Sequence, residues 1–372
     1  MISTVKRVRR GLRRRWAEWP YRRFQRLPEA SIYDLTGDPR VTTVVTAPAA
    51  SVNIAPTLEV APLPIELTRV KSVIRSVPEQ LAVMLPDAGI VGQYAVALWD
   101  GRRIRESALL SPRSAVQWAW PAGMARRESL TLDLAAPLCS PGSDSVYFVW
   151  MMHGAMRVPV IRALAETLGD MPKLIVPHSP ARFVHETLDL LGVAPEDRIR
   201  WTHSRGQARR LVVTSETRWG PTFVPATCFG FREAMRRAAG DPAPDQPRRL
   251  YISRSKARRR RVLNESAVIA LLAPLGFEAF TLEDLSVAEQ VRLFAGAEAV
   301  VAPHGSGLTN LVFGQGIKVI ELHTPSKYTN SFMALSRACG HTYAAWMAAT
   351  SGLDYDIDLD ALRGLLALQD LY

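Results

Sequence analysis

The sequence predicts an α/β protein of two domains. Short apolar runs alternate with segments of helical periodicity along most of the 372 residues, which is typical of βαβ units around a parallel sheet. Single cores usually divide beyond about 250–300 residues, and 48% hydrophobic with 22% charged residues suits ordinary globular cores. Residues 239–247 contain three prolines and no apolar periodicity, so we expect a linker there. The domains are expected over residues 41–240 and 248–372, after a separate segment of residues 1–40.

The first segment is basic and amphipathic. Residues 1–26 hold ten Lys or Arg against one acid, and five apolar side chains fall on one helical face: Val5, Val8, Leu12, Trp16 and Trp19. Such a helix suits the surface of an anionic membrane. A disordered basic tail, or a helix docked on the protein's own acidic surface, would show the same pattern.

The distribution of charge and of cysteines argues against a nucleic-acid-binding protein and against a disulfide-rich secreted one. The net charge of +11 is concentrated in residues 1–26 and 248–261, and the remainder is acidic. We find no helix-turn-helix, finger or aromatic RNA-binding motif, so nucleic-acid binding is not expected. Cys139, Cys228 and Cys339 form no paired motif, which suits a reducing compartment. No apolar run is long enough to span a membrane and no signal peptide is evident, so we expect a cytoplasmic protein, which would be peripheral on the inner face of the membrane if residues 1–26 bind there.

The expected elements follow in order. In the first domain we expect strands over residues 41–45, 81–85, 94–98 and 173–176 and helices over 157–168 and 181–191. In the second we expect strands over 250–253, 277–281, 299–302 and 318–322. Asn264 is expected to cap a helix that ends near residue 273, Ser286 and Glu289 form a capping box for a helix over 287–295, and a further helix is expected from Leu308.

The segment from Pro303 to Gly307 is the candidate site. It follows the buried strand 299–302, contains His304, Gly305, Ser306 and Gly307, and leads into the expected helix. Glycines let backbone N–H groups approach a phosphate, and a helix start adds unsatisfied donors. The pattern predicts an anion site; a tight strand-to-helix turn without a ligand fits the spacing equally well.

Residues at the ends of neighbouring strands could complete this site. Arg254 and Lys256 leave the strand 250–253 at the edge of the sheet where ligands bind, and guanidinium groups suit a diphosphate. The following run of arginines, 258–261, reads as a solvated surface. Glu321, at the end of the expected strand 318–322, could hold a ribose diol or pair with a basic residue. His304 is not expected to be a metal ligand, because no second ligand lies at suitable spacing.

In this order and spacing, the motifs resemble the C-terminal half of glycosyltransferase family 61. They are Tyr251-Ile-Ser-Arg254, the Arg-Arg downstream of it, Asn264-Glu265, Glu289-Gln290, His304-Gly-Ser-Gly-Leu-Thr-Asn310 and Val319-Ile-Glu-Leu322, and the match covers about residues 249–345. The family's usual turn is His-Gly-Ala-Gly-Leu, and Ser306 replaces its alanine. The resemblance implies two Rossmann-like domains facing a cleft (the GT-B arrangement), a nucleotide-sugar donor held by the C-terminal domain, and inverting transfer without a metal or other cofactor.

The N-terminal half departs from the family's pattern. Members commonly carry a His-Trp-Leu-x-Asp/Glu-x-Leu-Pro-Arg type of segment, and the corresponding run here begins at Val149. Trp150 and Arg157 are kept, but the acid, a candidate base in the family, is replaced by His153. A histidine can act as a base near neutral pH. His153 is therefore a tentative catalytic base or an ordinary helix residue.

We accordingly expect a glycosyltransferase that moves a sugar from a nucleoside diphosphate to a glycan or lipid-linked acceptor, in surface polysaccharide (capsule) synthesis. Expected donor-binding residues are Arg254, Lys256, Gly305, Ser306, Gly307, Asn310 and Glu321. His304 is placed with His153 as a catalytic candidate, and Arg157, Asn264 and Gln290 are further cleft candidates. The alternative is a catalytically weak relative that binds a nucleotide or a glycan as a scaffold.

Overall fold

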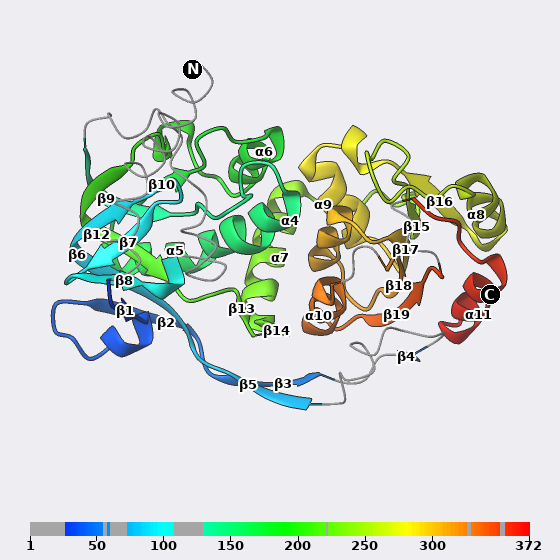
Figure 1. The fold of residues 1–372 in the computed structure, drawn as a ribbon, viewed down its shortest axis with the longest axis horizontal. Helices are drawn as coiled ribbons and strands as arrows, with labels where there is room; N and C mark the ends of the chain where they lie inside the picture. Colours follow the sequence, from blue (N-terminus) through cyan, green and yellow to red (C-terminus); the bar gives the residue numbers. More distant parts are fainter. Residues whose placement is uncertain are drawn as a thin grey trace, which may run out of the picture. The chain divides into compact units, whose positions relative to one another are not determined.

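A computed structural model describes residues 27–54, 58–59, 73–107, 129–220, 222–325, 329–349 and 354–372. The amphipathic helix expected over residues 1–26 lies outside these ranges. The chain is an α/β protein with one mixed sheet and one parallel sheet (Figure 1). Its described residues form two compact units, the first from 27–48, 79–184 and 193–216, and the second from 49–78, 185–192 and 217–372.

The first unit is built on a mixed sheet of nine strands among the described residues, in the order β1-β8-β7-β6-β12-β9-β10-β11, with β2 also paired to β6. The strands are β1 (Glu29–Ala30), β2 (Thr42–Ala47), β6 (Gln80–Val91), β7 (Val96–Trp99), β8 (Arg102–Ile104), β9 (Leu130–Pro137), β10 (Lys173–Val176), β11 (Arg198–Arg200) and β12 (Arg205–Thr214). Strands β12, β9, β10 and β11 are parallel, whereas β6 pairs antiparallel with β2, β7 and β12. Only part of this sheet therefore has the parallel pairing of a Rossmann-like domain.

The expected strands and helices of the first unit are present. Leu81, Val83 and Leu85 of β6 are fully buried, as the apolar run predicts for a central strand. After β9 the chain passes through α4 (Tyr147–Val149), the π-helix η4 (Trp150–Gly154) and the 3-10 helix η5 (Ala155–Arg157) into α5 (Val158–Leu168). A proline in its first turn and Gly169, at φ 69°, delimit α5. Helix α6 (Arg182–Leu190) follows β10.

The second unit contains a parallel sheet in the order β16-β15-β17-β18-β19-β4. Its strands are β4 (Leu58–Glu59), β15 (Arg249–Ile252), β16 (Phe277–Phe280), β17 (Ala299–Pro303), β18 (Lys318–His323) and β19 (Thr342–Met347). Every pairing in this sheet is parallel, as the alternation of strands and helices predicts. The unit also contains the strand pairs β3 (Ala50–Ile54) with β5 (Val73–Val77), and β13 (Arg218–Trp219) with β14 (Thr222–Phe223).

Helices cover the parallel sheet on both faces, which explains why its central strands are mostly apolar. Helices α8 (Glu265–Leu272) and α11 (Leu359–Leu368) share a buried cluster with alternate residues of the strands, such as Val301 and Ile320. Helices α9 (Val287–Ala295) and α10 (Ser331–Ala338) lie on the other side of the sheet in Figure 1, with α7 (Pro225–Ala239) beside α9. The carboxyl ends of β15, β17 and β18 consequently meet at one edge, where the expected site lies.

Two helix starts differ in detail from the sequence expectation. The capping box of α9 is present, because Ser286 Oγ accepts from Glu289 N and the Glu289 carboxylate accepts from Ser286 N. Asn264 does precede α8, but its side chain bonds the backbone of Ile357 in both directions instead of capping the helix. The helix expected from Leu308 is a 3-10 helix, η9, over Ser306–Phe313. None of the helices in the described ranges combines the length and apolarity that crossing a membrane requires.

Candidate functional site

The turn formed by residues 303–307, called the glycine turn below, lies at the carboxyl end of β17. Parallel pairing sets Ala302 beside Glu321 and Pro303 beside Leu322 of β18, and His304 N donates to Leu322 O at 2.8 Å. Gly305 is extended, with φ −176°, and leads into η9. The glycine turn is thus held between β15 and β18 at the edge of the sheet where ligands of parallel α/β folds bind.

Arg254 leaves β15 and lies against the glycine turn. A Cβ placed on Gly305 would be 2.1 Å from Nη1 and 3.0 Å from Cζ of Arg254, so only glycine permits this close approach. Nη2 of the half-buried Arg254 donates to Arg259 O at 3.1 Å, while its buried Nε has no hydrogen-bond partner in the part of the chain that the structure describes. A buried donor without an acceptor is costly, so a water molecule or a ligand is expected to supply one.

Arg260 is a second half-buried guanidinium near Arg254. Burial first, and then the nearby charge of Arg260, lower the pKa of Arg254. Burial also lowers the pKa of Arg260, which Tyr355 and Glu321 partly offset. Neither arginine forms an ion pair with a carboxylate of the described residues. The arginine pair, Arg254 and Arg260, therefore holds two close positive charges that an anion would relieve.

The sequence did not single out Arg260. It stands within four consecutive arginines, which by pattern alone read as a solvated surface. In the structure Arg260 adopts φ 62°, an uncommon value for a residue with a side chain, and Arg261 beside it is tied to Asp354 by three hydrogen bonds. The signal that separates Arg260 from its neighbours is this strained backbone, which arises only in the folded chain.

Behind the glycine turn lies a buried histidine–glutamate cluster, formed by His304, Glu321, His323 and Tyr343. Glu321 is fully buried; its Oε1 is 2.5 Å from His304 Nδ1, and its Oε2 accepts from Tyr343 Oη at 2.6 Å. The His304 and His323 rings stack with centroids 5.2 Å apart. Burial alone would raise the pKa of Glu321, but His323 and His304 outweigh it and hold the pKa below its ordinary value. Glu321 is therefore an anion that fixes the His304 ring.

The cluster also has the residue types of a metal centre. Ligand atoms of His304, Glu321 and His323 all lie within 4.8 Å of one another. The sequence did not anticipate this, because His323 is distant in the chain and comes close only through the pairing of β17 with β18. The 2.5 Å separation of His304 Nδ1 from Glu321 Oε1 is a hydrogen-bond distance, so this arrangement is that of a carboxylate–histidine pair.

The remaining candidates of the second unit are placed as follows. Asn310 is fully buried, and its Nδ2 donates to Gln290 Oε1 at 2.8 Å. Gln290 in turn donates to two backbone carbonyls that precede α9. A Cβ on Gly307 would lie 2.8 Å from Leu282 Cδ1, and Ser306 is partly exposed. These contacts lock η9 against α9 and fix the glycine turn. Lys256 instead forms an exposed ion pair with Asp284.

His153 and Arg157 belong to the first unit. His153 is buried within the π-helix η4 and meets the Phe148 ring edge to face, with centroids 6.0 Å apart. Arg157 is also buried and donates to Glu106 O at 2.6 Å and Thr214 O at 3.1 Å. Burial lowers its pKa to about 10, against the opposing effect of Glu216 and Glu106. The contacts of Arg157 join η5 to the sheet, and single π-helical turns are frequent at functional sites.

Comparison with known proteins yields a family match. The family model described as Glycosyltransferase 61 matches residues 133–320, just over half of the chain, from within β9 to within β18. The matched range includes η4 with His153, the arginine pair and the glycine turn. No match is found among the curated proteins compared with the chain.

Proposed function

Since the chain belongs to glycosyltransferase family 61 and is a glycosyltransferase, we propose that it takes its sugar from a nucleoside diphosphate bound at the glycine turn. The observation that carries this proposal is the arginine pair. Two half-buried guanidinium groups lie close enough for the charge of one to lower the pKa of the other, and neither has a carboxylate ion-pair partner among the described residues. One of them, Arg254, lies directly over Gly305. Planar guanidinium groups and backbone N–H groups suit the negatively charged oxygens of a diphosphate.

During transfer, the diphosphate leaves the sugar and its negative charge increases. Arg254, Arg260 and the backbone N–H groups of Gly305, Ser306 and Gly307 would stabilise this charge from fixed positions, which is the electrostatic form of catalysis. This stabilisation needs no metal ion, and we propose a metal-independent reaction. Lys256, paired with Asp284 at the surface, would add only long-range charge.

We propose that the role of Glu321 is to orient the His304 ring. The sequence suggested a ribose contact for Glu321, but its side chain is fully buried and both oxygens already have partners. Glu321 therefore orients His304, and His304 contacts the diphosphate. Asn310 and Gln290 position the turn through their mutual hydrogen bond. Asn264 ties the start of α8 to Ile357 and has no direct role.

For the acceptor, we propose inverting transfer with His153 as the base. In such a mechanism a base removes the proton of the acceptor hydroxyl while the diphosphate departs from the opposite face. His153 occupies the position of the family's candidate acid and lies in a π-helical turn. Its neighbour Arg157 would hold this segment to the sheet. His153→Gln should lower kcat and leave nucleoside diphosphate affinity unchanged.

We also propose the domain arrangement, the acceptor and the location of the protein. It comprises a GT-B arrangement with domains of residues 41–240 and 248–372, a glycan or lipid-linked acceptor in surface polysaccharide synthesis, and attachment of residues 1–26 to the inner face of the membrane. The contacts within the chain group residues 217–239 with the second unit. A two-domain reading therefore places α7 with the donor-binding part.

The test is release of nucleoside diphosphate from a panel of nucleotide sugars, with and without EDTA and an acceptor mixture. The proposal expects release from at least one donor, unaffected by EDTA and reduced in Arg254→Ala. Donor binding without release of nucleoside diphosphate in the presence of any acceptor would favour the scaffold alternative. Release that EDTA abolishes would instead point to His304, Glu321 and His323 as metal ligands.

A further inference from the structure

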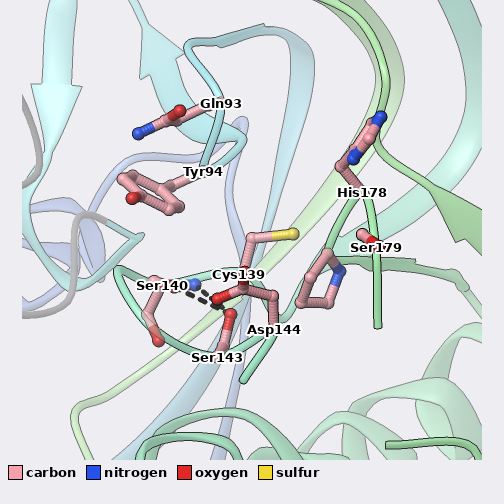
Figure 2. A pocket seen from close by; sticks show the side chains of 9 residues that line it. Gln93, Tyr94, Cys139, Ser140, Ser143, Asp144, His178 and Ser179 are labelled. Atoms are coloured by element: carbon pink, nitrogen blue, oxygen red, sulfur yellow. Dashed lines mark hydrogen bonds between the residues drawn. The ribbon is translucent and has the colours of Figure 1, made fainter. Parts of the chain in front are cut away.

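The first unit contains a pocket that none of the roles above uses (Figure 2). It has a volume of about 260 Å³ and is lined by Gln93, Tyr94, Cys139, Ser140, Ser143, Asp144, Pro177, His178 and Ser179. Residues 138–140 follow β9 and residues 177–179 follow β10, two adjacent parallel strands. The pocket thus lies beyond the carboxyl ends of parallel strands, the usual ligand position of an α/β sheet. Its volume is below the roughly 300–1,000 Å³ of sites for drug-sized ligands.

The chemistry of its lining selects a polar, uncharged ligand. Nearly all nine lining residues bear hydrogen-bonding side chains, and none of them is a lysine or arginine. Phosphate sites rely on such cations or on helix N-termini, so this pocket does not suit a phosphate. The Asp144 carboxylate would also repel one. A carboxylate, an amide, a phenol and several hydroxyls match instead the many hydroxyl groups of a sugar ring.

Two serines of the lining fix the loop that follows β9. Ser140 is 1% exposed, and its Oγ makes no hydrogen bond to any of the described residues. The neighbouring Ser143 is fully used, since its Oγ accepts from Ser140 N at 3.0 Å and donates to Ser140 O at 2.7 Å. These two bonds fix the loop after β9, as the dashed lines in Figure 2 show. Because Ser140 Oγ has almost no accessible surface, we assign no ligand contact to it, and the fixed loop instead holds Asp144 at the pocket.

The opposite side of the pocket is also held in place. Gln93 and Tyr94 stand across from His178 and Ser179 in Figure 2 and come from the turn between β6 and β7. Trp201 Nε1 donates to Gly92 O at 2.6 Å and so anchors this turn. Burial, and then the Asp144 carboxylate, raise the pKa of Tyr94, which keeps its hydroxyl protonated and able to donate. Tyr94 also offers an aromatic surface to the ligand.

We propose that this pocket binds a neutral sugar residue of the acceptor, with Asp144 and Tyr94 as its principal hydrogen-bonding contacts. The proposal rests on the proposed function, because it assigns the acceptor to the first unit. It adds the chemical class of the bound acceptor residue: a single neutral sugar ring, not a sugar phosphate or a uronic acid.

The test uses saturation-transfer NMR of the full chain with methyl glycosides of neutral hexoses, pentoses and N-acetylhexosamines, and with a methyl glucuronide. We expect binding of at least one neutral glycoside, weakened about tenfold in Asp144→Asn by the loss of a charge-assisted hydrogen bond. Asp87→Asn is the matched control, since Asp87 is an exposed aspartate of the same unit outside the pocket, and its φ of 48° is one that asparagine tolerates. It should leave binding unchanged.

Tyr94→Phe provides a second variant, because it keeps the ring and removes only the hydroxyl. The melting temperature should therefore change little while glycoside binding weakens. The proposal is overturned if no neutral glycoside binds, if binding is unaffected by both Asp144→Asn and Tyr94→Phe, or if the glucuronide binds as well as the neutral sugars. Calorimetry with nucleoside diphosphates, run in parallel, tests separately whether the proposed donor site binds its ligand.

Discussion

Replacing Gly305 with alanine tests how the glycine turn and the arginine pair act together. The new Cβ would lie 2.1 Å from Arg254 Nη1, whereas nonbonded heavy atoms prefer about 3.5–4.0 Å. The guanidinium must therefore withdraw by more than about 1 Å. The backbone of Gly305 is extended, so alanine itself fits, and the movement falls on the end of a flexible side chain. We expect folding to be little changed and the anion site to be displaced.

The expected loss is that of one charge-assisted hydrogen bond, about 1.5–3 kcal/mol in nucleoside diphosphate binding, or roughly 10- to 150-fold in Kd. Isothermal calorimetry measures this loss, and thermal unfolding checks the fold. Gly230→Ala is the control, because Gly230 lies in α7 with nothing within 4 Å of an added Cβ. It should stabilise the chain by about 1 kcal/mol and leave binding unchanged.

A double-mutant cycle separates a local clash from a general effect. If Gly305→Ala acts by moving Arg254, then adding it to Arg254→Ala should cause almost no further loss of affinity. Normal nucleoside diphosphate binding by Gly305→Ala would refute the reasoning. So would losses from the two substitutions that simply add.

Two further predictions concern the arginine pair and the buried cluster. Arg260→Asn introduces a residue that tolerates the observed φ of 62°, so the stability of the fold should not change. Calorimetry should show nucleoside diphosphate binding weakened by about 1.5–3 kcal/mol, because one charge-assisted hydrogen bond is lost. Intact binding would remove Arg260 from the site. Glu321→Gln should lower the unfolding free energy at neutral pH, because the pKa of Glu321 is below its ordinary value in the folded chain. That contribution is complete above about pH 5 and is lost as the pH falls through the folded pKa. Denaturant unfolding should therefore show the deficit constant from about pH 5 to 7 and smaller in acid, whereas a deficit that grows in acid would contradict the assignment.

Local sequence predicted the parallel sheet of the second unit well. Runs such as Ala299–Ala302 are apolar because helices cover both faces of the strand, and this signal needs no tertiary information. The capping box at Ser286 is equally local. The turn itself could be predicted because Pro303 and the glycines interrupt the apolar run before the next helix. These features predict a turn at the carboxyl end of β17, where the structure has it.

Other parts of the site depend on the folded chain. Four consecutive arginines carry no local signal that distinguishes Arg260, whose position follows from its strained backbone and the anchoring of Arg261 to Asp354. His323 and Tyr343 reach Glu321 only because β17, β18 and β19 pair in parallel. The mixed pairing of the first sheet arises from long-range contacts of β6, which apolar periodicity does not encode. The pocket beyond β9 and β10 comes from four separate segments and has no motif.

A crystal structure of the full chain with a bound nucleoside diphosphate would show whether the arginine pair and the glycine turn bind the donor's diphosphate. We predict diphosphate oxygens within hydrogen-bond distance of Arg254, Arg260 and the backbone N–H groups of residues 305–307, with Arg254 Nε satisfied by the ligand. A diphosphate bound elsewhere, with Arg254 Nε still lacking an acceptor, would contradict the account.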